Sequence, residues 1–283
     1  MYEKQIFFRY PNFRHRALTF SYDDGVKQDR RLIDILRAHG MRATFNLNGG
    51  LLDGIDRQQP THRMTREECL EVFAYEDTEV AMHAYTHPWL EQQPSSVVMQ
   101  EILLDRINLE SMFGRPVQGF AYPFGTYNDT VIDVLRMADA KYARTVESTH
   151  NFTLPENWLL LHPTCHHKDK ALFDLADRYL AWGENLERPG RAQMSMFYVW
   201  GHSYEFDTDG NWDVIERFAD KMAGHEEIWY ATNMEIYRYV EATCRAEIAP
   251  DSSYIYNPTA TDLYFLDGKG EGHTVRAGQT LSL

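Results

Sequence analysis

Short apolar runs alternate with amphipathic segments along most of this chain. The apolar runs predict strands at residues 17–22, 42–47, 79–83, 118–122, 141–146, 158–162, 196–200 and 227–231. Apolar residues at helical spacing predict helices at residues 29–39, 65–73, 95–113, 131–138, 170–183, 212–223 and 233–244. This alternation predicts an α/β fold with a parallel sheet, and seven or eight such units predict a closed or nearly closed (β/α) barrel.

Two of the expected helices carry further local signals. Residues 65–68 form a capping box, which predicts a helix start there. In the segment 95–113, the apolar residues are spaced to form one buried face, made of Ile102, Leu103, Ile107 and Leu109.

The pattern changes after residue 244. Short β segments separated by turn signals predict a small β appendage over residues 245–283, attached to a barrel domain over residues 1–244. The appendage either covers one end of the barrel or pairs with a second subunit, so a homo-oligomer is compatible with the sequence.

Charge and cysteine content narrow the classes of partner. The net charge of −14 argues against nucleic acid and against an anionic membrane surface. The three cysteines are widely spaced and odd in number, which favours a reducing compartment. With no signal peptide evident at the N-terminus, we expect a cytoplasmic protein.

The candidate chemistry begins with two histidines and two aspartates. His83 and His87 have the spacing that lets two imidazoles on one helical turn bind the same metal ion. Asp23 and Asp24 follow an apolar run, and on an extended backbone their side chains point apart, so one can bind the metal while the other faces the substrate. Alone, the first pair indicates a surface turn and the second a turn motif. Together they predict an open metal site for hydrolysis.

Further polar residues lie at the ends of the expected strands. Asp23, His83, Tyr122, His162 and His202 each lie at or just after the end of an expected strand. Functional groups of a (β/α) barrel collect at that edge, which favours one shared site.

Four segments resemble motifs of the polysaccharide deacetylase family, the NodB-homology carbohydrate esterases. These segments are LTFSYDDG at residues 18–25, EVAMHAYTHP at 79–88, FAYPFG at 120–125 and FYVWGH at 197–202. They come in the family's order and span most of the chain. The resemblance implies the NodB type of distorted (β/α) barrel.

The resemblance also implies roles for individual residues. Asp24, His83 and His87 would bind one divalent metal ion, with zinc expected and cobalt, nickel or iron as alternatives. Asp23 would act as general base and His202 as general acid. The backbone N–H of Phe124 would bind the oxyanion. The expected reaction is N-deacetylation of an amino sugar or short oligosaccharide.

The sequence departs from the family pattern at three places. Ala84 stands where a serine or threonine is expected, and Ala121 replaces an arginine that normally orients the base. We expect Arg144, at the end of the next strand, to take the place of that arginine. Three additional histidines, His162, His166 and His167, either line the substrate groove or belong to a polar loop; a second metal is disfavoured because no carboxylate has an obvious ligand spacing.

Further residues near the motifs are candidates for substrate binding. Tyr122, Trp200 and Tyr204 lie next to the motifs, as do Tyr85, Trp89 and Trp212, and aromatic faces suit sugar rings, although each alone is also an ordinary core residue. Glu205 and Asp207 could bind hydroxyls or an amine, or be solvated loop acids.

Two other functions stay open at this point. Some relatives of this fold act on cyclic imides or ureides, and some of these need no metal. The replacements at Ala84 and Ala121 also fit a carbohydrate-binding protein with a degenerate site.

Overall fold

A computed structural model describes residues 5–53, 62–183 and 193–283 of the chain, and its largest element is a curled parallel sheet. Within these residues the strand order is β6-β5-β4-β3-β2-β8-β7, and β9 also pairs with β2. All pairings in this sheet are parallel. The strands are β2 (Arg16–Asp23), β3 (Ala43–Leu47), β4 (Thr78–Met82), β5 (Gly119–Ala121), β6 (Tyr142–Arg144), β7 (Cys165–His166), β8 (Ser195–Gly201) and β9 (Ile228–Tyr230).

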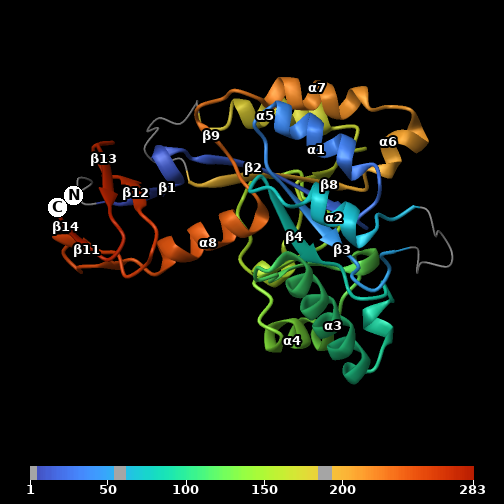
Figure 1. Cartoon of the computed structure of the whole chain (residues 1–283). Coiled ribbons are helices and arrows are strands. Elements are labelled where there is room, and N and C mark those ends of the chain that lie inside the picture. The colour runs from blue at the N-terminus through green and yellow to red at the C-terminus, as the bar shows by residue number, and fades with distance from the viewer. Residues whose placement is uncertain (1–4, 54–61, 184–192) are drawn as a thin grey trace.

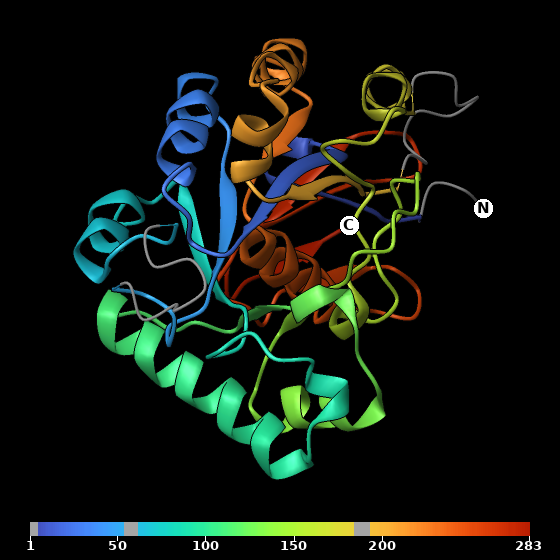
Figure 2. The same ribbon diagram turned by 90° about the vertical axis from the view of Figure 1, so that its right-hand side faces the viewer.

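Helices cover the outer face of this sheet. In Figure 1, α1, α5 and α7 lie on one side and α3 and α4 on the other, and Figure 2 shows the outer helices as an arc around the strands. The α-helices are α1 (Asp29–Ala38), α2 (Arg66–Val72), α3 (Ser95–Phe113), α4 (Asp129–Met137), α5 (Leu172–Leu180), α6 (Tyr204–Asp209), α7 (Asp213–Met222) and α8 (Asn233–Cys244). The 3₁₀-helices among the described residues are η1 (Pro11–Phe13), η2 (Leu90–Gln92), η3 (Pro123–Gly125) and η4 (Trp158–Leu160). Among the described residues, no helix has the length and apolarity needed to cross a membrane.

The apolar core has two main parts, one on each face of the sheet. The larger part lies between the strands and the outer helices, and includes Phe20, Phe45 and Phe197. The second part includes Tyr198 of β8 together with Ile236 of α8. Strand β2 is buried along its whole length, as expected for a central strand covered on both faces.

This architecture confirms the predicted fold class. The strands curl into a half-barrel with β6 and β7 at its two ends, so the sheet is a distorted (β/α) barrel of the NodB type. Helices connect sequential strands of the sheet: α1 lies between β2 and β3, α2 between β3 and β4, α3 between β4 and β5, and α4 between β5 and β6.

The strand predicted at residues 158–162 was wrong. The segment forms the 3₁₀-helix η4, and only Leu161 makes an isolated parallel bridge, to Arg144. The side chain of Asn157 accepts the N–H of Leu159 at 3.0 Å, which turns the backbone away from an extended course. An apolar run alone cannot reveal this local competition.

The buried face predicted for the helix at 95–113 was also partly wrong. The helix has the predicted bounds, and Ile102 and Leu109 are buried, but Leu103 and Ile107 are exposed. The buried face instead includes Asp105, whose carboxylate accepts backbone N–H groups near the site described below. Helical spacing predicted the bounds of the helix correctly, but it did not predict which of its faces is buried.

The C-terminal residues form short antiparallel strands beside the barrel (Figure 1). They are β10 (Glu247–Ile248), β11 (Tyr254–Tyr256), β12 (Leu263–Leu266), β13 (Gly272–Val275) and β14 (Thr280–Ser282). The N-terminal strand β1 (Phe7–Arg9) pairs with β12, so both ends of the chain contribute to this appendage. The predicted division at residue 244 stays a prediction.

Candidate metal and catalytic site

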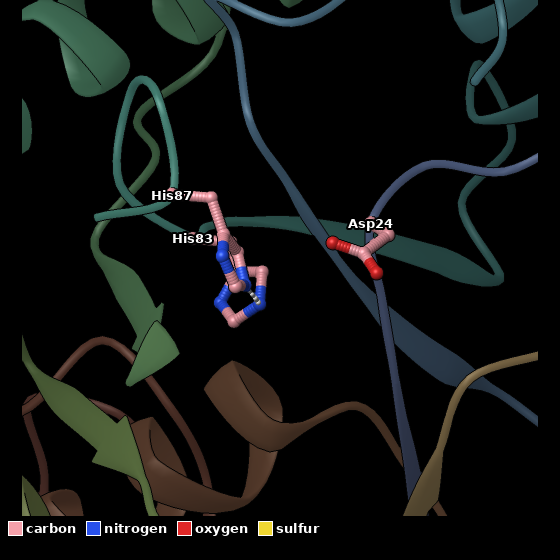
Figure 3. A group of neighbouring side chains, drawn as sticks. All are labelled: Asp24, His83 and His87. Carbon is pink, nitrogen blue, oxygen red and sulfur yellow. Dashed lines mark hydrogen bonds between the residues drawn. The ribbon is translucent and has the colours of Figure 1, made fainter. Parts of the chain in front are cut away.

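Two imidazoles and a carboxylate meet at one edge of the sheet, in the segments that follow β2 and β4. The candidate ligand atoms of Asp24, His83 and His87 all lie within 4.8 Å of one another. The Nε2 atoms of the two histidines are 3.2 Å apart. In Figure 3 the two rings lie together, and the Asp24 carboxylate lies opposite them. This donor set fits a divalent ion, because it supplies two neutral nitrogens and one carboxylate and leaves positions open.

The two histidines do not lie on a helical turn, as the spacing had suggested. Residues 83–89 form a loop in which Ala84 has φ of 62° and His87 has φ of 57°. These left-handed conformations are incompatible with a right-handed helix, and Pro88 follows directly. The loop nevertheless turns the two side chains toward each other. Strained backbone of this kind is typical of functional sites.

The ring of His83 is held so that one nitrogen faces the candidate metal position. Its Nδ1 lies 2.8 Å from the carbonyl oxygen of Ala121, which is positioned to accept a proton carried on Nδ1. That arrangement leaves Nε2 unprotonated toward Asp24, as in metal sites that orient histidine through its second nitrogen. Burial lowers the pKa of His83 to about 4, so the ring is neutral near pH 7. The backbone N–H of His83 donates to Asp105.

Asp24 is fixed by a buried arginine. Its backbone has φ of 85°, which turns its side chain out of the strand direction. The guanidinium of Arg63 donates to the Asp24 carbonyl and, at 3.1 Å, to its carboxylate. Burial acts to raise the pKa of Asp24, but Arg63 and the nearby imidazoles outweigh it and lower the pKa below its usual value. Asp24 is therefore ionised and suited to bind a cation.

Asp23 is buried, and its charge is compensated by Arg144. The Arg144 Nη2 atom donates to both Asp23 carboxylate oxygens, one of them at 2.5 Å, and Asn46 donates to the same carboxylate at 2.7 Å. Burial acts to raise the pKa of Asp23, but Arg144 and the nearby histidines hold it at about 2. In the sheet register, Arg144 of β6 lies directly beside Ala121 of β5. The small side chain of Ala121 leaves space on that face of the sheet.

His202 lies just after β8 and faces both aspartates. Its Nε2 atom is 3.9 Å from an Asp23 oxygen and 4.0 Å from an Asp24 oxygen. Burial acts to lower the pKa of His202, but its hydrogen bond to Glu205 and the charges of Asp23 and Asp24 raise it above its usual value. A histidine in this state can carry a proton to a group bound between the aspartates.

An exposed aromatic pair borders the two histidines. The rings of Trp89 and Phe124 are stacked, with centroids 3.8 Å apart and planes 4° apart. The edge of His87 contacts Phe124, with ring centroids 4.6 Å apart. Trp89 and Phe124 are 43% and 45% exposed, so the pair presents an apolar surface to solvent beside the site. Phe124 has φ of 58°, another left-handed residue.

Of the remaining predicted residues, some lie next to this cluster and others lie away from it. Trp200 packs under Arg144, whose guanidinium carbon is 4.5 Å from the ring centroid, and Tyr204 lies beside His202. Tyr122 is buried and donates its hydroxyl to the carbonyl of Leu159. The Nδ1 atom of His162 lies 2.7 Å from the Thr145 hydroxyl, and His162 lines a separate cavity of about 390 Å³.

Sequence reasoning missed three residues that hold the site. These are Arg63 beside Asp24, Asn46 beside Asp23, and Asp105 behind His83. Only Asn46 left a usable signal, because it lies near the end of the neighbouring expected strand; in the structure it is paired in register with Asp23. Arg63 and Asp105 come from a loop and from a helix face, and their positions depend on tertiary packing.

The fold and the site together define a class: α/β half-barrel proteins in which two histidines and one aspartate form a candidate metal site next to a second, buried carboxylate. Residues 10–143 match the family model described as polysaccharide deacetylase. The match confirms the predicted resemblance to the polysaccharide deacetylase family, a family of hydrolases, over nearly half of the chain. The matched residues include both aspartates and both histidines of the cluster but not His202.

Solved structures share parts of this fold at low sequence identity. One is a protein from Mycobacterium smegmatis that is provisionally named as a polysaccharide deacetylase. It is 15% identical to this chain with a TM-score of 0.57, and the match covers 83% of this chain and 93% of that one. A family 4 carbohydrate esterase from Streptomyces lividans, in complex with acetate, is 19% identical with a TM-score of 0.46, covering 77% and 92%.

The Streptococcus pyogenes deacetylase PplD, also in complex with acetate, is 22% identical with a TM-score of 0.43. That match covers 50% of this chain and 61% of PplD, so this chain spans less than two thirds of that relative. Among curated proteins, none matches the chain.

Proposed function

We propose that this protein is a metal-dependent hydrolase of carbon–nitrogen bonds in non-peptide amides, and that it removes N-acetyl groups from an amino sugar or a short oligosaccharide. One observation carries the proposal: the His83–His87–Asp24 group lies next to both a buried, ionised Asp23, 3.9 Å from His83, and a histidine of raised pKa, His202, 4.0 Å from Asp24. A base and an acid next to a cation site are what amide hydrolysis requires.

The proposed roles follow from the positions of these groups. One divalent ion, zinc by preference, would be held by Asp24, His83 and His87 and would supply Lewis-acid chemistry. Asp23, oriented by Arg144, accepts a proton from the attacking water. As the carbon–oxygen bond forms and the carbon–nitrogen bond breaks, His202 gives a proton to the departing amine, and acetate is the second product. The backbone N–H of Phe124 stabilises the developing oxyanion.

The surroundings of the site support a sugar as the substrate. The stacked pair of Trp89 and Phe124 offers a flat apolar surface against which the face of a pyranose ring can pack. The net charge of −14 suits a neutral substrate or a cationic amine product rather than a polyanion. The three free cysteines, two of them buried, support a reducing compartment such as the cytoplasm.

Metal analysis combined with an acetate-release assay on chitooligosaccharides tests the proposal. We expect close to one metal ion per chain and acetate release that Asp23→Asn lowers by at least about 10²-fold, the usual contribution of a general base. Asp34→Asn, a matched change at an exposed carboxylate of α1, should leave the rate unchanged. Full metal occupancy with no acetate from any N-acetyl sugar would reject deacetylation and favour a cyclic imide or ureide as substrate.

A further inference from the structure

Glu205 places one carboxylate oxygen among three imidazoles next to the site. It lies in the first turn of α6, three residues after His202. Its Oε2 atom is 3.4 Å from His202 Nδ1, 3.1 Å from His166 Nε2 and 3.5 Å from His167 Nε2. The backbone N–H of His202 also donates to this oxygen, at 3.1 Å. A single acceptor therefore fixes both the backbone and the ring of His202.

The neighbouring histidine His166 is oriented as a proton donor toward Glu205. The backbone N–H of Lys168 donates to His166 Nδ1 at 3.1 Å. A neutral imidazole that accepts at Nδ1 carries its proton on Nε2, and that nitrogen faces Glu205. Burial acts to raise the pKa of Glu205, but its hydrogen bonds from His166 and His202 hold the pKa well below the usual range. Glu205 is thus an ionised acceptor for both rings.

The wall behind Glu205 is rigid. The ring of His167 is buried between Tyr22 and Phe206, with ring planes 12° and 25° from parallel. A side chain at Gly201 would overlap the His167 ring, so the close approach of β8 requires glycine there. Because Phe206 follows Glu205 in α6, this stack fixes the turn that presents the carboxylate.

We propose that Glu205 is the positioning residue for the proton donor of the proposed reaction. Its carboxylate accepts the Nδ1–H of His202 and so keeps the second ring nitrogen, Nε2, directed at the space beside Asp23 and Asp24. Without this contact, a rotated ring would present Nδ1, or no nitrogen, to the departing amine. This inference rests on the proposed function, since it gives His202 the role of acid.

If Glu205 positions the proton donor, the rate loss on its replacement should depend on the leaving group of the substrate. A purely structural role would lower the rate for every leaving group. An amine must be protonated to depart, whereas the phenolate of 4-nitrophenyl acetate leaves without a proton. In Glu205→Gln we expect kcat on an N-acetyl chitooligosaccharide to fall about 10²-fold, the lower end of a general-acid contribution. KM, metal content and the rate on 4-nitrophenyl acetate should change less than about threefold. Glu205→Asp, which keeps the charge, should restore part of kcat.

Asp209→Asn is the matched control. Asp209 belongs to the same helix and forms an ion pair with Lys168 at 2.6 Å, and Lys168 also lies 3.8 Å from Glu205. The control therefore removes a carboxylate from the same charge cluster without changing the contact to His202, and its rates should match those of the unmodified protein. Equal losses on the amide and the aryl ester in Glu205→Gln would overturn the proposal.

A spectroscopic measurement keeps the inference testable even if no amide substrate is found. Long-range ¹H–¹⁵N NMR of the zinc-loaded protein should show the proton of neutral His202 on Nδ1, and this assignment should be lost or mixed in Glu205→Gln. A proton on Nε2 in the unmodified protein would overturn the inference. Binding of a second zinc ion that Glu205→Gln abolishes would also overturn it, because the three imidazoles would then surround a metal rather than a proton acceptor.

Discussion

Arg144 contacts Asp23 from the strand next to the one that carries Ala121. The sequence has Ala121 where the family motif has an arginine, and the structure brings the Arg144 guanidinium onto Asp23 from the adjacent register position. Arg144 is fully buried, and its guanidinium forms an ion pair with that carboxylate. A buried carboxylate left without its partner is costly and poorly oriented.

Replacing Arg144 should therefore reduce turnover without removing the metal. In Arg144→Ala we expect kcat to fall by about 10²-fold, because Asp23 loses its orientation, while zinc content stays near one ion per chain. Arg144→Lys should retain part of the rate, since it keeps the charge but not the two-oxygen contact. Steady-state kinetics with metal analysis checks this. If a guanidinium next to Asp23 is all that turnover requires, adding Ala121→Arg to Arg144→Ala should recover activity. Unchanged turnover in Arg144→Ala would reject this role.

Asp29 should make stability depend on pH. Burial, together with the charges of Asp24 and Asp23, raises the pKa of Asp29 from 3.8 to about 8, against hydrogen bonds from Ser203 and the Val26 N–H. Between these two pH values the folded protein holds a proton that the unfolded chain releases. Stability from this group should thus fall as pH rises from about 4 to about 8, with a slope near 1.4 kcal/mol per pH unit, and level off above.

Urea unfolding of Asp29→Asn and of the unmodified protein between pH 5 and 8 measures this effect. The difference between the two free energies of unfolding should grow with pH in favour of the amide, which has no proton to lose. Asp34→Asn controls for a general change of charge, and its difference should be flat. A flat difference for Asp29→Asn as well would show that Asp29 titrates normally.

At the scale of elements, the site depends on loops in left-handed conformations. Asp24, Ala84, His87 and Phe124 all have positive φ, and each lies directly after a strand or in the loop that follows it. The parallel sheet brings these loops to one edge, and the loops then turn individual side chains or N–H groups toward the centre. Secondary structure alone would not give this geometry.

Replacing Gly125 tests whether one such loop positions the Phe124 N–H. It follows Phe124, has φ of 73°, and a Cβ there would overlap the side chain of Val146. In Gly125→Ala we expect both the strain of a left-handed alanine, about 1 kcal/mol, and displacement of the loop that carries the Phe124 N–H. Activity should fall by about 10-fold or more, because loss of one oxyanion donor costs about 10²–10³ in rate.

Gly40→Ala is the matched control for that variant. Gly40 has φ of 67° but no atom within 4 Å of an added Cβ, so only the backbone strain applies. Thermal unfolding should show a similar strain cost in both variants and a further loss in Gly125→Ala, and only Gly125→Ala should lose activity. Equal activities in the two variants would show that the loop does not position the oxyanion donor.

At the scale of the whole molecule, the proposed ion links two segments of the sheet. Asp24 follows β2, and His83 and His87 follow β4, with β3 between these strands. An ion bound only by the folded protein stabilises it by RT ln(1 + [metal]/Kd), which is about 2.7 kcal/mol at one hundred times Kd. Metal binding should therefore be visible as a change in stability, independent of any substrate.

Chelation should lower Tm, and added zinc should restore it in a concentration-dependent way. For a domain of this size, about 2.7 kcal/mol corresponds to a shift of several degrees. His87→Ala should abolish the zinc-dependent shift, whereas His162→Ala, a histidine that bonds Thr145 rather than the cluster, should keep it. Scanning calorimetry with zinc titration checks both, and an unchanged Tm on chelation would count against the metal site.

The alternation of apolar runs and amphipathic segments was sufficient to predict the class of fold and most element positions. It failed at residues 158–162, where the Asn157 side chain accepts a backbone N–H and a 3₁₀-helix forms instead of a strand. It also failed to predict the buried face of α3, which includes Asp105. Both failures have the same cause. Periodicity records which residues are apolar, but it does not record which partners tertiary packing will bring to them.

The sequence by itself determined the resemblance to the family and the four segments that carry the candidate chemistry, because these depend on residue types in a fixed order along the chain. Only the tertiary structure decided how His83 and His87 meet without a helix, and why Arg144 can stand beside Ala121. It also decided that Glu205, one acid among many in the sequence, contacts His202. These relations depend on distances between segments far apart in the chain, and those distances are set by sheet register and packing.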